Sequence, residues 1–226
     1  MSADLRFDKS RSARRKANAE GRNGRPVSRA AQGLLAAAGL FAMVLLVASF
    51  ALSGVVKLNL TASMPIGLYL LRPTSATHRG AVVIVCPPPE AQRIGVANGY
   101  LAPARGLMPG SRCSSGSAPL LKYAIAFAGD EIEISENGLF LNGRLIDTQT
   151  PARLDRRGRK LAPVPFGRYR LTIGQVWLYS PARYSWDSRY FGPARLSDVL
   201  GTAAPLWTTS PVAPAPTWDR RNKPEP

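Results

Sequence analysis

Residues 30–56 carry no charged side chain, and this run of 27 residues constrains the chain more than any other feature. As an α-helix it would extend about 40 Å, at about 1.5 Å per residue, which exceeds the hydrocarbon core of a bilayer, about 30 Å thick. A single span must be helical, because unpaired backbone polar groups are costly in lipid. The run therefore predicts one transmembrane anchor. A buried core helix and a cleaved signal peptide remain alternatives, the second because Ala48-Ser49-Phe50-Ala51 could serve as a small-residue cleavage site.

The segment before this run is strongly basic. Residues 1–29 contain nine Lys or Arg and three acidic residues, a net charge of +6. Such a run predicts a solvated, disordered tail, and the positive-inside rule keeps it in the cytoplasm. Everything after about Lys57 then lies outside the membrane, which is the periplasm in a bacterium with two membranes. The chain after this tail is still basic, with 21 Lys or Arg and 11 acidic residues, a net charge of +10 out of +16 for the whole chain, and we expect this charge to aid contact with anionic membrane lipid near the anchor. Direct nucleic-acid binding is not expected, because no motif of a nucleic-acid module is present.

The part after the anchor predicts a mainly β domain of barrel or sandwich type over residues 57–207. Short β-rich or alternating runs are separated by Gly, Pro and Asn-Gly turns, which favours this architecture over an α/β sheet. A Pro-rich, charged tail over 208–226 is expected to be disordered. We expect strands at 68–71, 81–85, 120–127, 131–134, 139–141 and 175–179, with a short helix around 90–96.

Two cysteines, Cys86 and Cys113, lie in the part predicted to be exported. An even count in an oxidising compartment suggests a disulfide. In the chain-entropy model, closing a loop of this size contributes roughly 3–4 kcal/mol. Free thiols and a metal site are the alternatives. The chain has one histidine and no Cys-x-x-Cys, so no metal and no cofactor are expected.

The candidates for catalysis are few. The only histidine, His78, precedes a predicted strand and is interpreted as an exposed turn residue. Lys122 lies inside an apolar run, Pro119 to Phe127, where burial would lower its pKa towards the range of a general base. The alternative is a lysine whose ammonium reaches water from an edge strand. Ser63 is the candidate nucleophile, because Pro65 and Gly67 hold its backbone in a bend shortly after the anchor.

Three segments occur in a fixed order: Ser63-Met64-Pro65-Ile66-Gly67, Lys122 with Gly129-Asp130, and Ser185-Trp186-Asp187-Ser188-Arg189-Tyr190-Phe191-Gly192. Together they resemble the type I signal peptidases, the Ser/Lys family S26. The likeness covers roughly residues 57–205. Within the family the chain is most similar to the TraF-type peptidases of conjugative transfer.

The resemblance implies a role for each matching residue. Ser63 would be the nucleophile and Lys122 the general base. The Ser63 N–H and the Thr61 hydroxyl would form the oxyanion hole. Ser185 matches a serine that hydrogen-bonds the lysine. Asp187 matches an aspartate that TraF-type enzymes need, with Arg189 as its neighbour, although a purely structural ion pair is equally compatible.

The chain departs from the family pattern ahead of the last segment, where a Gly-Asp-Asn element is absent. Any partner that this element supplies to Arg189 must therefore come from elsewhere.

The resemblance further implies a serine endopeptidase in the bacterial inner membrane. Its substrate would be a pilin or another precursor with a leader peptide, and its partner the conjugative type IV secretion machinery. Water would release the trimmed chain, and the substrate's own amine would give a cyclic product. A non-catalytic bitopic scaffold of the transfer apparatus and a general leader peptidase are the alternatives.

Overall fold

The computed structural model describes residues 28–52, 55–73, 77–103 and 113–216. The chain divides into two compact units, residues 1–48 and 49–226, and each is described by itself. The predicted basic tail lies almost entirely outside the described residues, since the description begins at Ser28.

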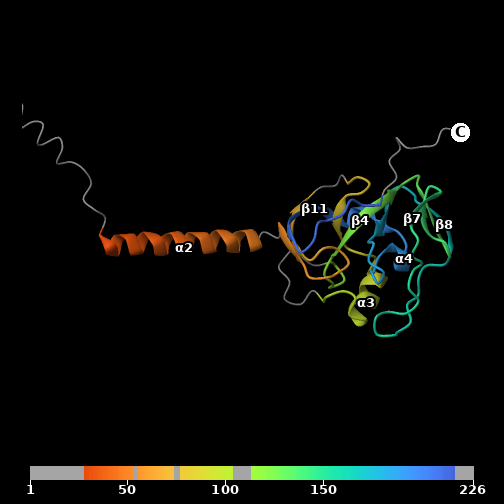
Figure 1. Ribbon diagram of the computed structural model, residues 1–226, viewed down its shortest axis with the longest axis horizontal. Coiled ribbons are helices and arrows are strands. Elements are labelled where there is room, and N and C mark those ends of the chain that lie inside the picture. Colours follow the sequence, from red (N-terminus) through yellow and green to blue (C-terminus); the bar gives the residue numbers. More distant parts are fainter. Residues whose placement is uncertain (1–27, 53–54, 74–76, 104–112, 217–226) are drawn as a thin grey trace, which may run out of the picture. The chain divides into compact units, whose positions relative to one another are not determined.

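Helix α2 (Arg29–Leu52) accounts for most of the apolar run (Figure 1). Its first turn is capped by Ser28, whose Oγ accepts a hydrogen bond from the Ala31 N–H at 3.2 Å. Large apolar side chains from Leu34 to Leu46 are exposed. Within the described part of the chain, α2 alone has the length and composition to cross a membrane. The helix therefore suits either an anchor or a signal sequence.

The helix is shorter than the predicted span of 30–56. It ends at Leu52, and Val56 already belongs to a strand that pairs with Leu70. Val55 and Val56 are β-branched, and the segment after Gly54 gains ladder hydrogen bonds by extending, which outweighs continuation of the helix.

The described residues of the second unit form eleven strands and two short α-helices after the end of α2. Most of the strands predicted from the sequence are confirmed within one or two residues, and the mainly β fold class is confirmed with them. In chain order the elements are β1 (Val56–Asn59), β2 (Gly67–Arg72), β3 (Val82–Val85), α3 (Pro89–Ala97), β4 (Leu120–Phe127), β5 (Glu131–Ser135), β6 (Gly138–Leu141), β7 (Arg144–Asp147), β8 (Gly167–Arg170), β9 (Gln175–Tyr179), α4 (Ser188–Phe191), β10 (Ala194–Arg195) and β11 (Val199–Thr208).

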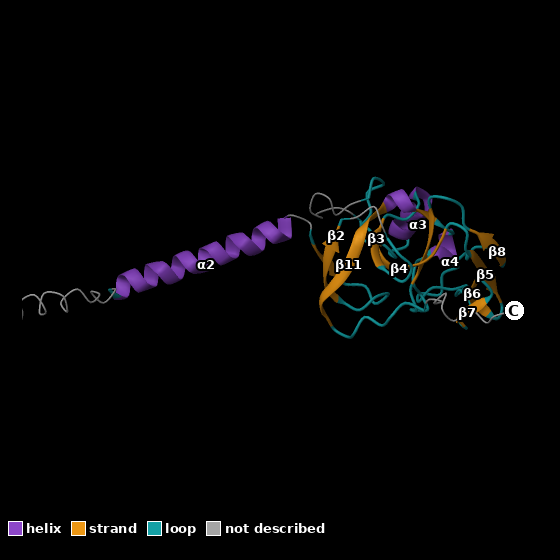
Figure 2. Cartoon of the chain, turned by 90° about the horizontal axis from the view of Figure 1, so that it is seen from above, coloured by secondary structure: helices purple, strands orange, loops and turns teal. Residues whose placement is uncertain are grey.

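The strands form two antiparallel sheets. The larger has the order β1-β2-β11-β3-β4-β9-β10, and the smaller has the order β7-β6-β5-β8. Figure 2 shows β2, β11, β3 and β4 following one another, with β5 to β8 gathered at the opposite end of the domain. Strand β4 lies in the interior of the larger sheet, between β3 and β9.

The hydrophobic core occupies both faces of β4. Leu120 and Ala124 pack in one cluster, which also contains Ala91 of helix α3. Tyr123 and Ile125 pack in a second cluster with residues of the smaller sheet. A central strand buried on both faces has little freedom to move, so it is a rigid support for any side chain that it carries.

Strand β11 was not predicted as a strand and corrects the expected C-terminal boundary. It runs to Thr208, and the chain after it still contacts the core, since Val212 and Ala215 pack on the second cluster. The Tyr123 hydroxyl also donates a hydrogen bond to the Ala213 carbonyl. Disorder from 208 is therefore wrong for residues 208–216. Residues 217–226 lie outside the described part of the chain.

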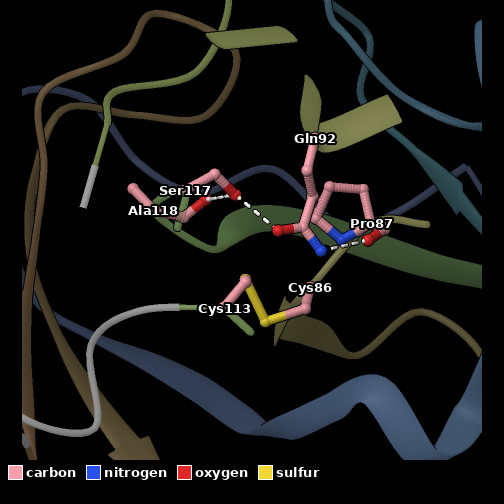
Figure 3. The surroundings of a disulfide bond; sticks show 6 residues. All are labelled: Cys86, Pro87, Gln92, Cys113, Ser117 and Ala118. Carbon is pink, nitrogen blue, oxygen red and sulfur yellow. Dashed lines mark hydrogen bonds between the residues drawn. A yellow bond between two sulfur atoms is a disulfide. The ribbon is translucent and has the colours of Figure 1, made fainter. Parts of the chain in front are cut away.

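A disulfide joins Cys86, directly after β3, to Cys113, shortly before β4 (Figure 3). Their Cα atoms lie 5.5 Å apart. The buried side chain of Gln92 reinforces the same closure: it donates to the Pro87 carbonyl at 2.7 Å and accepts from Ser117 Oγ at 3.0 Å. The segment that leads into β4 is thus attached to the end of β3.

Replacing both cysteines, Cys86→Ala with Cys113→Ala, should lower the free energy of unfolding by about 3–4 kcal/mol, because the bond closes a loop of 27 residues. Denaturant unfolding of the full chain in detergent, followed by tryptophan fluorescence, measures this. Reducing the wild-type chain should shift its midpoint equally, whereas the reductant should not affect the double variant. An unchanged midpoint in the double variant would contradict the prediction.

Candidate active site

Lys122 lies in the middle of β4, where it pairs with Val83 of β3. Its side chain is 1% exposed. Burial disfavours the ammonium form and lowers the pKa of Lys122 from 10.5 to about 8, with Asp187 opposing the shift and Arg189 adding to it. Lys122 is therefore buried, as expected. The alternative, a lysine whose ammonium reaches water from an edge strand, is wrong, because the amine does not reach the surface.

Ser63 lies in the turn between β1 and β2, at the entrance to this buried amine. Lys122 Nζ and Ser63 Oγ are 2.7 Å apart, although 59 positions separate the residues in sequence. Ser63 is half-buried and therefore accessible from outside, whereas the amine behind it is enclosed. A hydroxyl within hydrogen-bond distance of an amine of lowered pKa is the arrangement of an activated nucleophile.

Two residues that the sequence analysis did not single out hold this turn. Asn59, at the end of β1, bonds the backbone of Thr61, Met64 and Pro65 through its side chain. Ser180, directly after β9, donates from its Oγ to the Ser63 carbonyl. Asn59 could have been found in the sequence, because an Asn at the end of a strand commonly bonds the backbone N–H two residues on in an Asx turn. Ser180 offered no such signal.

Thr61 lies beside the nucleophile, as predicted for a second oxyanion donor. Its Oγ1 is 3.3 Å from Ser63 Oγ. The same hydroxyl is 2.8 Å from Asn59 Oδ1, to which it donates. Thr61 is exposed, so its hydroxyl can rotate towards a bound substrate.

Asp187 and Arg189 form a buried ion pair, in which Arg189 Nη2 and Nε donate to the two carboxylate oxygens at 2.8 and 2.9 Å. Arg189 also donates to the Ser180 and Ala182 carbonyls, and Asp187 accepts from the Ser180 N–H. The Asp147 carboxylate lies 3.7 Å from Arg189 Nη1 as a second acidic neighbour, so Arg189 has partners without a Gly-Asp-Asn element. The pair therefore fixes the loop whose Ser180 side chain holds Ser63.

Ser185 does not make the hydrogen bond to Lys122 that the resemblance implied. Its Oγ is buried, yet it has no hydrogen-bond partner among the described residues. Lys122 Nζ bonds Ser63 Oγ instead. His78 is exposed, as expected. No three metal-binding side chains cluster anywhere in the described ranges.

Comparison with known protein families gives one match across most of the chain. The sequence model of the family described as signal peptidase, peptidase S26, matches residues 29–207. The chain belongs to this family.

Among curated S26-like relatives, the conjugal transfer protein TraF of Agrobacterium fabrum is 34% identical over 166 residues, covering 71% of this chain and 86% of the relative. A plasmid transfer protein TraF of Escherichia coli is 30% identical over 185 residues, covering 81% of this chain and 98% of that protein. Among solved structures, a signal peptidase I from Enterococcus faecalis aligns with a TM-score of 0.31 and 16% identity, over 57% of this chain and 97% of the other.

The buried amine of Lys122 should lower the free energy of unfolding at pH values below its pKa in the folded chain. Lys122 is protonated in the unfolded chain up to 10.5 but in the folded chain only up to about 8. Wild-type stability should therefore rise with pH between these two values, since the unfolded chain binds more protons there. Lys122→Met fills the same space without a charge, so at pH 7 we expect it to be more stable than wild type, by on the order of 3 kcal/mol.

Unfolding free energies of wild type and Lys122→Met, measured from pH 7 to 11, check this. The advantage of the variant should fall away above about pH 8 and vanish near 10.5. The exposed Lys160 is the matched control, and Lys160→Met should show no such pH-dependent advantage. An equal loss of stability in both variants would contradict the assignment.

Proposed function

We propose that this chain is a membrane-anchored serine endopeptidase, with Ser63 as the nucleophile and Lys122 as the general base. One observation carries the proposal: the enclosed amine of Lys122 lies 2.7 Å from the half-buried hydroxyl of Ser63. A scaffold gains nothing from burying an amine, because burial costs free energy. Membership of the S26 family supports the same reading.

The proposed reaction begins with the neutral amine. Lys122 Nζ accepts the proton of Ser63 Oγ as the oxygen attacks the scissile carbonyl. The Ser63 N–H and the Thr61 hydroxyl stabilise the oxyanion, once the hydroxyl turns from Asn59 Oδ1 to the substrate. The Lys122 ammonium then protonates the leaving amine, which leaves an acyl-enzyme. An incoming nucleophile gives its proton to Lys122 and releases the product, and Ser63 Oγ recovers a proton.

The proposed setting is the outer face of the bacterial inner membrane, with the N-terminus in the cytoplasm. Leu58, Leu68 and Trp207 are exposed and lie opposite one another on β1, β2 and β11, and Leu60 and Leu206 are exposed beside them. This apolar surface adjoins the nucleophile turn and suits membrane lipid. The disulfide is consistent with an oxidising compartment.

The proposed biological role is maturation of a pilin precursor for conjugative transfer, in contact with the type IV secretion machinery. It rests on the relatives, whose names describe conjugal and plasmid transfer proteins. The acyl-enzyme can be resolved by water, giving a trimmed linear pilin, or by the pilin's own N-terminal amine, giving a cyclic one.

Intact-mass analysis of the pilin from the same conjugative element tests this role. Wild-type enzyme should yield a shortened pilin, and a product lighter by about 18 Da than the linear trimmed chain would identify cyclisation, which expels one water. Ser63→Ala and Lys122→Ala should each abolish processing, with a loss of at least about 1,000-fold. The exposed residues Ser197 and Lys160 supply matched controls, Ser197→Ala and Lys160→Ala. Normal processing by either site variant would refute the peptidase.

The rate of processing should depend on the protonation of Lys122. Because the base must be neutral, kcat/KM should rise about tenfold per pH unit below the lysine pKa and level off above it. The midpoint should lie near pH 8, the value to which burial lowers this pKa. Initial rates between pH 6 and 10 measure the profile. A profile that falls from pH 7 to 9 would contradict the role of Lys122.

A further inference from the structure

The side chain of Asn59 makes an unusually dense set of contacts with the turn that carries Ser63. Its Nδ2 lies 3.0 Å from each of three carbonyl oxygens, those of Thr61, Met64 and Pro65. Its Oδ1 accepts from the Thr61 N–H at 3.2 Å and from Thr61 Oγ1 at 2.8 Å. One half-buried amide therefore contacts both sides of the nucleophile.

The chemistry of these contacts requires an amide in one orientation. The nitrogen faces three carbonyls, and the oxygen faces the N–H and the hydroxyl of Thr61. A flipped amide would therefore lose every bond to the backbone and could keep only the Thr61 hydroxyl, which can also accept. A carboxylate would place an acceptor against three carbonyls. A hydroxyl is too short to reach both groups and cannot supply two N–H donors. The turn therefore requires Asn at position 59. The β1–β2 ladder does not, because it is formed by backbone groups.

The contacts restrict the peptide groups on either side of Ser63. Asn59 holds the carbonyls of Thr61, Met64 and Pro65, and Ser180 holds the carbonyl of Ser63. The peptide between Ala62 and Ser63, which carries the Ser63 N–H, lies between these held groups. Its orientation is therefore set by its neighbours, as is the direction of the Ser63 side chain.

We infer that Asn59 is a positioning residue for the reaction proposed above, on which this inference rests. It holds the Ser63 N–H and Oγ in their attacking geometry and keeps the Thr61 hydroxyl beside the future oxyanion. Asn59 itself does not touch the substrate. Its loss should lower the rate of acyl transfer while leaving substrate binding and the base Lys122 in place, because misplacement of a nucleophile by about 1 Å can cost on the order of 100-fold in rate.

The test compares full-length Asn59→Ala and Asn59→Asp with wild type in detergent, on the same pilin precursor. For Asn59→Ala, kcat per folded enzyme should fall by about 10- to 100-fold with KM little changed. Its pH midpoint should stay at the wild-type value. Asn59→Asp should lose as much rate and also raise the midpoint, since a new carboxylate near Ser63 favours the Lys122 ammonium.

Asn98 provides the matched control, because its amide also bonds a backbone carbonyl, that of Ile94, but at the end of α3. Asn98→Ala should process the precursor at the wild-type rate. Wild-type kcat in Asn59→Ala, or a loss that vanishes after correction for the folded fraction, would overturn the inference. Ser63→Ala, run in parallel, separates the two proposals: activity in that variant would refute the peptidase itself, whereas an inactive Ser63→Ala beside a fully active Asn59→Ala would refute only the role of Asn59.

Discussion

The arrangement of this domain depends on one interaction, the hydrogen bond between the buried amine of Lys122 and the solvent-accessible hydroxyl of Ser63. Burying Lys122 costs free energy, and its position is on β4, an interior strand of the larger sheet. Burial makes the amine a usable base, and rigid packing on both faces of β4 keeps it aimed at Ser63. Ser63, by contrast, lies on a turn near one edge of the sheet, so its backbone must be held by other contacts.

Those means are hydrogen bonds that converge on the backbone of the turn. Asn59 binds it from the preceding strand, and Ser180 binds it from the loop after β9. Asp187 and Arg189 belong to the same construction, because they hold the Ser180 loop by its N–H and carbonyl groups. The Asp187–Arg189 ion pair is therefore connected to the backbone of Ser63 through one intervening residue, Ser180.

Much of the fold and part of the site could be predicted from the sequence, wherever the local residue pattern reflects the burial of the segment in the fold. The apolar neighbours of Lys122 indicated its burial, a β-branched run located β3, and a longer apolar run located β4. The contact between Ser63 and Lys122 could be predicted only from the family resemblance, since no local signal links residues 59 positions apart.

Strand β11 was not predicted because Gly201 and Pro205 interrupt its sequence pattern. Its stability comes from pairing with β2 and β3. The bond expected for Ser185 is not made: its Oγ has no partner among the described residues, and Lys122 Nζ bonds Ser63 Oγ.

The position of β11 also has a consequence for how the domain is completed. Among the described strands, the backbone ladder connects the β1–β2 hairpin, and with it Ser63, to β3 and β4 only through β11. Strand β11 is the last strand in the described part of the chain, so a polypeptide that emerges from its N-terminus presents Ser63 and Lys122 long before it presents the strand that joins them. Such non-local pairings require long loops to close first, which costs entropy before the contacts contribute. The sheet can therefore hold Ser63 against Lys122 only after nearly the whole domain has been synthesised.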